Sequence, residues 1–291
     1  MFSLDNQKWE GLNPIPYSQN PKEPFSIEHG GDYGNAMELF RAVMNQSELS
    51  PRALEITTFL ISVSPSNPYL YWYREKILDK LGFDFNNELE FSSKLALNFL
   101  KPYQIWRHRQ WIMERAPQSS SIDETKFVQD VLQNDGKNFH VWEYIYWYAG
   151  KFDKWQWLLD QTTVQLNIDP KNNSAWSMRY SSITHIHMKP SDDIQFALEK
   201  FKECPSSQSC ASYIKGLLDI DISLANEVKN MLTSVLSQNN NYVPALNLSA
   251  QIAEMEGNIE EYDRIIDQIA AVDTMRTHFW HLMKSNSSRF T

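Results

Sequence analysis

The sequence predicts an all-α fold, a solenoid of about seven helical hairpins that repeat with a period of about 35 residues. Three observations support this prediction: apolar residues recur at helical spacing, no segment shows the alternation of a strand, and an aromatic motif recurs along the chain. A unit of about 35 residues holds two helices of about a dozen residues and two turns. One such hairpin cannot bury its apolar face alone, so successive hairpins are expected to stack on a continuous core with a concave surface.

The composition excludes several classes of protein. The 291 residues include 27 Lys and Arg against 36 Asp and Glu, a net charge of −9, and no basic run that would grip a nucleic-acid backbone. Only nine glycines are present, and neither a dinucleotide-binding glycine motif nor a P-loop occurs. The two cysteines, Cys204 and Cys210, match no redox or zinc pattern, and the first ten residues lack the features of a signal peptide. We therefore expect a cytoplasmic protein with reduced thiols and no transmembrane segment.

The chain divides into a predicted extended arm, residues 1–32, and a single helical-repeat domain, residues 33–291. The arm contains Leu12-Asn-Pro-Ile-Pro16 and shows little periodicity. The pattern is helical from Tyr33 onward, and Ser50-Pro51 is a good helix start because a capping hydroxyl precedes a proline at the first helical position. That helix is expected to end at Ser64-Pro65. The further predicted helices cover 70–81, 87–99, 103–116, 122–133, 139–149, 154–166, 174–187, 192–203, 209–219, 224–237, 242–255, 259–270 and 275–285.

The repeat is visible as a tryptophan followed three residues later by an arginine. Trp106, Trp142 and Trp176 are separated by 36 and 34 residues. The arginine positions of the first four copies hold Arg74, Arg109, Ile145 and Arg179. In the first copy this spacing puts Tyr71 rather than Trp72 in the tryptophan place; a fifth copy has Ala211 there, and Trp280 falls in phase about two periods later. We interpret the tryptophans as interior packing, and the arginines as partners of carbonyls or carboxylates in the next unit.

These motifs resemble the repeat of protein prenyltransferase alpha subunits, which reads approximately Asn-Tyr-x-x-Trp-x-x-Arg. The arm and Leu49-Ser-Pro-Arg-Ala-Leu54 are most similar to the subunit shared by farnesyltransferase and geranylgeranyltransferase type I. The resemblance implies a right-handed superhelical crescent that wraps a separate beta subunit. The heterodimer would transfer a prenyl group from an isoprenoid diphosphate to a cysteine near the C-terminus of a CaaX protein. This chain would be inactive alone and would bind no cofactor; the holoenzyme would use zinc, held by the beta subunit, and magnesium.

The resemblance also assigns site residues. Asp135-Gly-Lys-Asn-Phe-His140 matches a family motif whose lysine lies near the diphosphate, so Lys137 is the expected catalytic residue. Its ammonium would stabilise charge that develops on the departing diphosphate. The expected substrate-binding residues share positions at the starts of helices, where capping the backbone is the alternative role. They are Gln104, Phe139, His140, Asn172 and Asn173. No metal ligand is expected in this chain.

Two departures from the family pattern lie in the repeat that carries Lys137. Phe139 replaces a tyrosine and loses a hydroxyl, and Ile145 replaces an arginine and loses a charge. An apolar residue can fill such an interior position if its former partner has also changed. Two alternatives stay open at this point: the alpha subunit of a Rab geranylgeranyltransferase, and a noncatalytic helical-repeat scaffold that binds a protein on its concave face.

Overall fold

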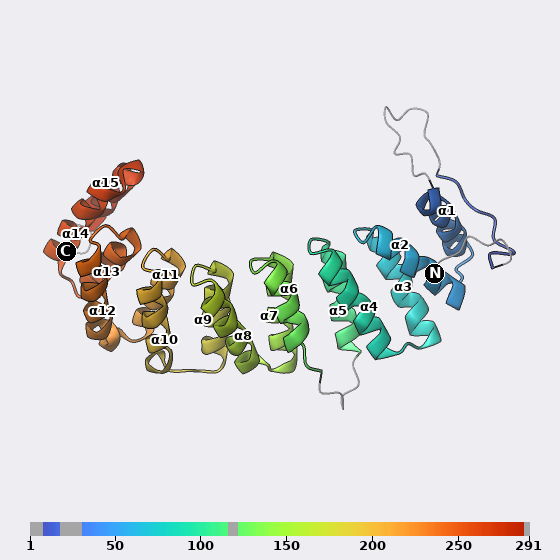
Figure 1. The fold of residues 1–291 in the computed structure, drawn as a ribbon, viewed down its shortest axis with the longest axis horizontal. Helices are drawn as coiled ribbons and strands as arrows, with labels where there is room; N and C mark the ends of the chain where they lie inside the picture. The colour runs from blue at the N-terminus through green and yellow to red at the C-terminus, as the bar shows by residue number, and fades with distance from the viewer. Residues whose placement is uncertain (1–7, 18–30, 116–121, 288–291) are drawn as a thin grey trace. The chain divides into compact units, whose positions relative to one another are not determined.

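The computed structural model describes residues 8–17, 31–115 and 122–287 (Figure 1). Within these ranges the chain forms fifteen α-helices and two short 3-10 helices, and no strand, as the sequence predicts. Contacts divide it into two compact units, Met1–Tyr144 and Ile145–Thr291. Arm residues 1–7 and 18–30, and the predicted last residue of the 103–116 helix, lie outside the described ranges.

The helices of the first unit are short and regularly spaced. They are α1 (Gly31–Asn45), α2 (Pro51–Val63), α3 (Pro68–Leu81), α4 (Phe85–Asn98), α5 (Tyr103–Glu114) and α6 (Thr125–Asn134), followed by α7 (Phe139–Phe152), which crosses into the second unit. The second unit continues with α8 (Trp155–Ile168), α9 (Asn173–His185), α10 (Pro190–Glu203), α11 (Gln208–Ile220), η1 (Ile222–Leu224), α12 (Ala225–Gln238), α13 (Val243–Met255), α14 (Ile259–Val272), η2 (Thr274–Arg276) and α15 (Thr277–Ser287). Each predicted helical segment from 33 onward is thus present, within a few residues at its ends.

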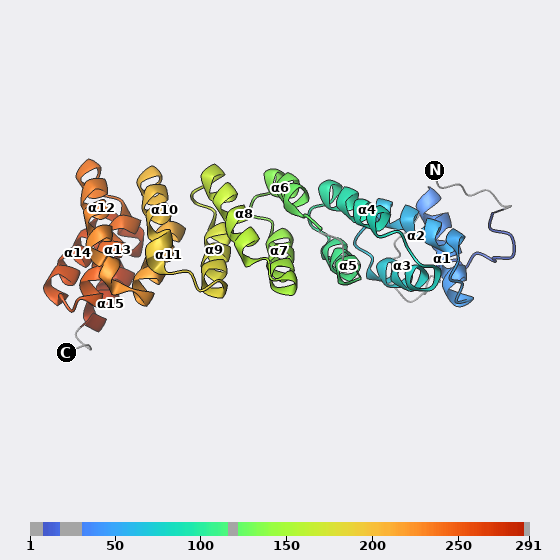
Figure 2. The same cartoon turned by 90° about the horizontal axis from the view of Figure 1, so that it is seen from below.

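Consecutive helices pack as hairpins, and the hairpins stack in two layers within each unit (Figure 2). In the first unit α2 packs on α3 and α4 on α5, while α3 also contacts α5 and α4 contacts α6. In the second unit α8 packs on α9 and α10 on α11; α9, α11 and α13 form one layer, and α10 and α12 the other. The stacking buries the apolar stripe of each helix, as expected for a helical solenoid.

Side-chain caps define the helix starts. Ser50 accepts a hydrogen bond from the Ala53 amide at 3.2 Å, directly before Pro51, which confirms the predicted start of α2. In later repeats the capping residue lies four positions before the tryptophan place, at Asn172 of α9 and Ser207 of α11. Such caps satisfy amide groups that the first helical turn leaves without a partner.

The tryptophans of the repeat are buried, as predicted. Trp106, Trp142 and Trp176 are each exposed by 3% or less. The indole Nε1 of Trp142 donates to the Gly136 carbonyl, six residues earlier, at 2.9 Å. Trp176 donates in the same way to the Pro170 carbonyl, also at 2.9 Å.

The first repeat uses a tyrosine in the tryptophan place. The Tyr71 hydroxyl donates to the carbonyl of Pro65, again six residues earlier, at 3.0 Å, and Tyr71 is only 4% exposed. Trp72, by contrast, is 47% exposed. The register that the arginine spacing predicts is therefore correct.

The arginines form buried bridges between neighbouring helices. Arg109 donates through Nε and Nη2 to the two Glu124 oxygens at 2.8 and 2.7 Å, and through Nη1 to the hydroxyls of Ser92 and Ser93. Arg74 repeats the pattern with Glu88, Thr57 and Thr58, and Arg179 with Asp193, Thr162 and Thr163. The predicted bonds to a carboxylate of the following unit are confirmed, and the hydroxyl pair of the preceding helix adds a second anchor.

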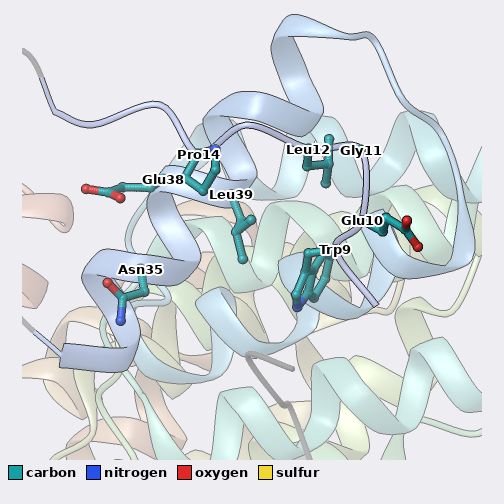
Figure 3. A pocket seen from close by; sticks show the side chains of 8 residues that line it. All are labelled: Trp9, Glu10, Gly11, Leu12, Pro14, Asn35, Glu38 and Leu39. Atoms are coloured by element: carbon teal, nitrogen blue, oxygen red, sulfur yellow. The ribbon is translucent and has the colours of Figure 1, made fainter. Parts of the chain in front are cut away.

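The arm segment 8–17 lies against α1 and α2. Trp9 and Leu12 are buried, at 5% and 7% exposure, and Figure 3 shows them beside Leu39 of α1. The Arg52 guanidinium donates to the carbonyls of Lys8 and Glu10, and Gly11 takes a positive φ of 81° in the turn between them and Leu12. This part of the predicted arm is therefore packed on the helices through two apolar side chains.

No described helix has the length and apolar character needed to cross a membrane.

Candidate functional site

The candidate site begins at the loop that joins α6 to α7, which carries Lys137. Asp135 ends α6, and its side chain accepts the Lys137 amide at 3.2 Å while its carbonyl accepts the Asn138 amide at 3.1 Å. The Gly136 carbonyl receives the Trp142 indole. The Lys137 side chain is exposed. A lysine is thus presented to solvent by a loop whose backbone is held on both sides.

Asn138 connects this loop to the preceding hairpin. It is 6% exposed and caps α7, since its Oδ1 accepts the amides of His140 at 3.0 Å and Val141 at 3.2 Å. Its Nδ2 donates to the Leu100 carbonyl at 2.9 Å. One buried side chain therefore joins the loop before α5 to the loop before α7.

Lysines occupy the same loop position in three consecutive repeats. Lys101, Lys137 and Lys171 each lie five residues before the repeat tryptophan, and each is exposed. The bond from Asn138 to Leu100 brings the loop of Lys101 next to the loop of Lys137. The sequence argument selected Lys137 alone; the periodicity of the tryptophans was the signal that would have found Lys101 as well.

Gln104 and His140 lie in the first turns of α5 and α7. Gln104 is 8% exposed and donates through Nε2 to the Ser66 carbonyl at 2.6 Å, but its Oε1 has no hydrogen-bond partner among the described residues. The Nδ1 atom of His140 also lacks one, since the nearest carboxylate oxygen, in Glu143, is 4.0 Å away and too distant for a hydrogen bond. The third buried polar atom without a partner within the described ranges is Nε1 of Trp106.

These three atoms all belong to α5 and α7 in the first unit. Buried polar groups in folded proteins nearly always have a partner, so each exception needs an explanation. A bound molecule or a partner chain at the starts of α5 and α7 would supply one.

Phe139 lies at the surface next to His140. Its ring is 72% exposed and meets the His140 ring edge-on, with centroids 5.6 Å apart. Tyr103 of α5 occupies the equivalent position and is 55% exposed. Large aromatic side chains with such exposure are candidates for contact with another molecule.

Asn172 and Asn173 belong to the second unit. Asn172 is 1% exposed and caps α9, with its Oδ1 accepting the Ala175 amide at 3.2 Å, so the structure supports the capping role for this residue. Asn173 is exposed and lines a groove of about 300 Å³ between α9 and α11, together with Tyr180 and Ser212. A role of either residue in substrate binding stays a prediction.

Below the loops, a buried ionic cluster supports α3, α4 and α5. His108, which is 1% exposed, contacts Glu88 through Nε2 at 2.6 Å and Glu75 through Nδ1 at 3.0 Å. Burial raises the pKa of Glu88, but hydrogen bonds from His108 and Arg74 outweigh it and lower the pKa to about 2. The cluster therefore holds a carboxylate in the interior of the repeat that presents Gln104.

The next two carboxylates of this kind are Glu124 and Asp193, each of which receives a tyrosine from the following repeat. The Tyr144 hydroxyl donates to Glu124 at 2.8 Å, and Tyr213 donates to Asp193. Burial first, and then the adjacent carboxylates, raise the pKa of both phenols far above the ordinary value. The sequence argument did not name the acids, although each follows its arginine by 14 or 15 residues.

The substitution of Ile145 follows the same spacing. The positions 17 residues before and 14 residues after it hold Val128 and Leu159, where the arginine repeats have a hydroxyl and a carboxylate. All three residues are buried. Ile214 in the fifth copy is likewise matched by Ala197 and Val228. The charge and its partners have thus been replaced together, as expected for this departure.

The described residues contain no group of three or more His, Cys, Asp or Glu side chains that could hold a metal ion.

Comparison with known proteins connects this architecture to one family. The family model of the protein prenyltransferase alpha subunit repeat matches residues 85–116. The chain is 28% identical to the protein farnesyltransferase/geranylgeranyltransferase type-1 subunit alpha of Candida albicans over 296 residues, covering 95% of this chain and 97% of that protein. It is 37% identical to the corresponding subunit of Schizosaccharomyces pombe over 110 residues, a match that spans 38% of this chain and 37% of the relative.

A solved structure agrees over nearly the whole chain. It is Candida albicans protein geranylgeranyltransferase-I complexed with GGPP, with a TM-score of 0.81, 25% identity, and coverage of 95% of this chain and 97% of the other. The fold is therefore that of a helical-repeat alpha subunit. The matches confirm the predicted resemblance to protein prenyltransferase alpha subunits, and to the subunit that farnesyltransferase and geranylgeranyltransferase type I share.

Proposed function

We propose that this chain is the alpha subunit of a heterodimeric CaaX protein prenyltransferase, in which it wraps a beta subunit and is inactive alone. The observation that carries the proposal is the agreement, over 95% of the chain, with a solved geranylgeranyltransferase-I subunit. The enzyme would act in the cytoplasm on an isoprenoid diphosphate and a cysteine thiol of the protein substrate. In this proposal residues 33–291 work as one helical-repeat domain, and the arm packs on its first helices.

The chain's chemical contribution would be electrostatic. As the allylic carbon–oxygen bond breaks, negative charge develops on the departing diphosphate, and a fixed ammonium stabilises that charge more in the transition state than in the ground state. Lys137 is the proposed catalytic residue. Lys101 has the same loop position one repeat earlier, and Asn138 bonds the two loops together, so we include Lys101 in the same role.

The substrate contacts would come from the first turns of α5 and α7. The unpartnered Oε1 of Gln104 and Nδ1 of His140 support these two residues as ligands of the substrate or of the partner subunit. The exposed ring of Phe139 offers apolar contact beside them. Asn172 and Asn173 are proposed to support the site from the loop before α9.

The metals of the holoenzyme are assigned outside this chain. Zinc would need three or four nitrogen or sulfur ligands, and the described residues do not fit that requirement, because they hold no cluster of such side chains. We propose that the beta subunit binds zinc, which would activate the thiol, and that magnesium accompanies the diphosphate. No step in this chain's role depends on either metal.

The test is co-expression with a beta subunit from the same source, followed by co-purification and measurement of prenyl transfer to a CaaX peptide. Lys101→Ala and Lys137→Ala are expected to lower kcat without disrupting the complex, by about 100-fold for the lysine closer to the diphosphate, since loss of one charge-stabilising donor commonly costs that much. Lys171→Ala, at the same position one repeat later, is the comparison. A stable complex whose turnover neither Lys101→Ala nor Lys137→Ala changes would remove the catalytic role and leave only the subunit assignment.

A further inference from the structure

Asn138 is the point where two lysine-bearing loops meet. Its side chain caps α7 through Oδ1 and reaches the preceding hairpin through Nδ2, which donates to the Leu100 carbonyl at 2.9 Å. Lys101 follows Leu100 directly, and Lys137 precedes Asn138 directly. Each lysine is therefore one residue away from an end of the same hydrogen bond.

We propose that Asn138 is a positioning residue, whose amide sets the distance between the loops of Lys101 and Lys137 and thereby places both ammonium groups on one diphosphate. This inference rests on the proposed function. It assigns Asn138 no contact with substrate; the residue acts through the two lysines.

Burial makes this bond suited to such a role. Asn138 is 6% exposed, so its amide bonds are shielded from competing water and are stronger than they would be at the surface. Breaking the bond would leave the Leu100 carbonyl without the donor it now has, which favours keeping the loops together. The Trp142–Gly136 bond and the Asp135 contacts fix the rest of the Lys137 loop, so that the loop moves as one piece with Asn138.

The chain contains a comparable tie that joins a different pair of loops. The Ser207 hydroxyl caps α11 and donates to the Pro170 carbonyl at 2.9 Å. It links the loop of Lys171 to a loop with Ser206 in the lysine place. In the part of the chain that is described, Asn138 is the capping residue whose tie has a lysine on both sides, and Ser207 is the matched control.

The experiment compares Asn138→Ser with Ser207→Ala in the co-purified heterodimer. Serine keeps a good helix cap but is too short to reach Leu100, so the helix start is preserved while the tie is lost. We expect Asn138→Ser to lower kcat about tenfold with little change in KM for the peptide, because a displacement of about 1 Å can cost up to 100-fold in rate. Ser207→Ala, which removes both cap and tie, is expected to lower thermal stability at least as much and to leave kcat unchanged.

A double-mutant cycle decides whether Asn138 acts through the lysines. In a Lys101→Ala, Lys137→Ala background, adding Asn138→Ser is expected to change kcat less than twofold, since the groups it positions are gone. An undiminished tenfold loss in that background, or an equal kcat loss in Ser207→Ala, would overturn the inference. If the lysine double variant is slow and Asn138→Ser is as fast as the parent, the inference fails while the proposed function stands. If the lysine double variant is itself as fast as the parent, the lysine role fails and the inference fails with it.

Discussion

At the scale of single residues, each charged side chain in the repeat interior has its partners fixed by the period. Glu88 is the clearest example, since Arg74 and His108 both bond it inside the stack of α3, α4 and α5. A buried ion pair adds little net stability compared with apolar packing, but removal of one partner leaves an uncompensated charge. The residues of such clusters are therefore sensitive to single changes.

Glu88→Gln is expected to destabilise the chain by about 3 kcal/mol, because Arg74 would stay buried without its carboxylate. Urea unfolding of the heterodimer or of the isolated chain measures the change. The control is Glu90→Gln on the same helix: Glu90 pairs with Lys94 at the surface, where both side chains are more than 60% exposed. That change should cost less than about 0.5 kcal/mol. Equal effects of the two variants would contradict the buried-cluster account.

The same carboxylate predicts a direction for the pH dependence of stability. The folded-state pKa of Glu88, about 2, is below the ordinary value of 4.5, so the unfolded chain binds the proton more readily. The stability that Glu88 contributes is complete above the ordinary value and is lost as the pH falls from there toward 2. Stability curves between pH 5 and pH 3 should therefore fall less steeply for Glu88→Gln than for the parent, a difference of opposite sign being inconsistent with the assigned contacts.

At the scale of helices and hairpins, most of the architecture was predictable from the sequence, because the period of the tryptophans and the starts of the helices are local signals. The number, order and approximate ends of the helices follow from it, as does the interior place of the tryptophans. The bonds from Asn138 to Leu100 and from Arg109 to Glu124 were not predicted as pairs. They join residues 38 and 15 positions apart, and their partners depend on how one hairpin is seated on the next.

The candidate site was predictable only where a motif marked it. Lys137 and its neighbours belong to a recognisable motif, but Lys101 has a proline after it and was missed. The unpartnered atoms of Gln104 and His140 appear only once the helices are packed. In contrast, the capping role of Asn172 was already one of the two readings that its place before a helix allows.

The coordinated replacement of charged residues in the fifth repeat makes a prediction at this scale. Ile214→Arg should destabilise the second unit by about 3 kcal/mol, because Ala197 and Val228 now occupy the places of the hydroxyl and the carboxylate. Adding Val228→Glu, at the spacing of Asp193 from Arg179, should recover part of that loss. Thermal unfolding of the two variants measures it, and a double variant less stable than Ile214→Arg alone would show that the spacing does not define the partner.

At the scale of the whole molecule, the arm extends the packing of the first unit. Trp9→Ala should destabilise that unit by about 3 kcal/mol, the usual cost of removing a buried tryptophan side chain. Limited proteolysis and thermal unfolding would measure the effect, with Tyr17→Ala as the control because Tyr17 is 52% exposed. Comparable losses in both variants would mean that the packing of Trp9 is not what holds the arm.

The chain's acidic character is compatible with work on a diphosphate. The net charge of −9 gives no general attraction for an anion, so a few placed cations must provide it. The three lysines before α5, α7 and α9 meet that need through their position in the repeat. The partner subunit would supply the remaining groups of the site, including the metal ligands that the described residues of this chain do not provide.

The central claim is that this chain is one half of a prenyltransferase. The most direct measurement is prenyl transfer to a CaaX peptide by this chain alone, by the beta subunit alone, and by the co-purified pair. The account predicts turnover by the pair and none by either chain alone. A pair that forms but transfers no prenyl group, or a chain that binds no prenyltransferase beta subunit, would contradict it.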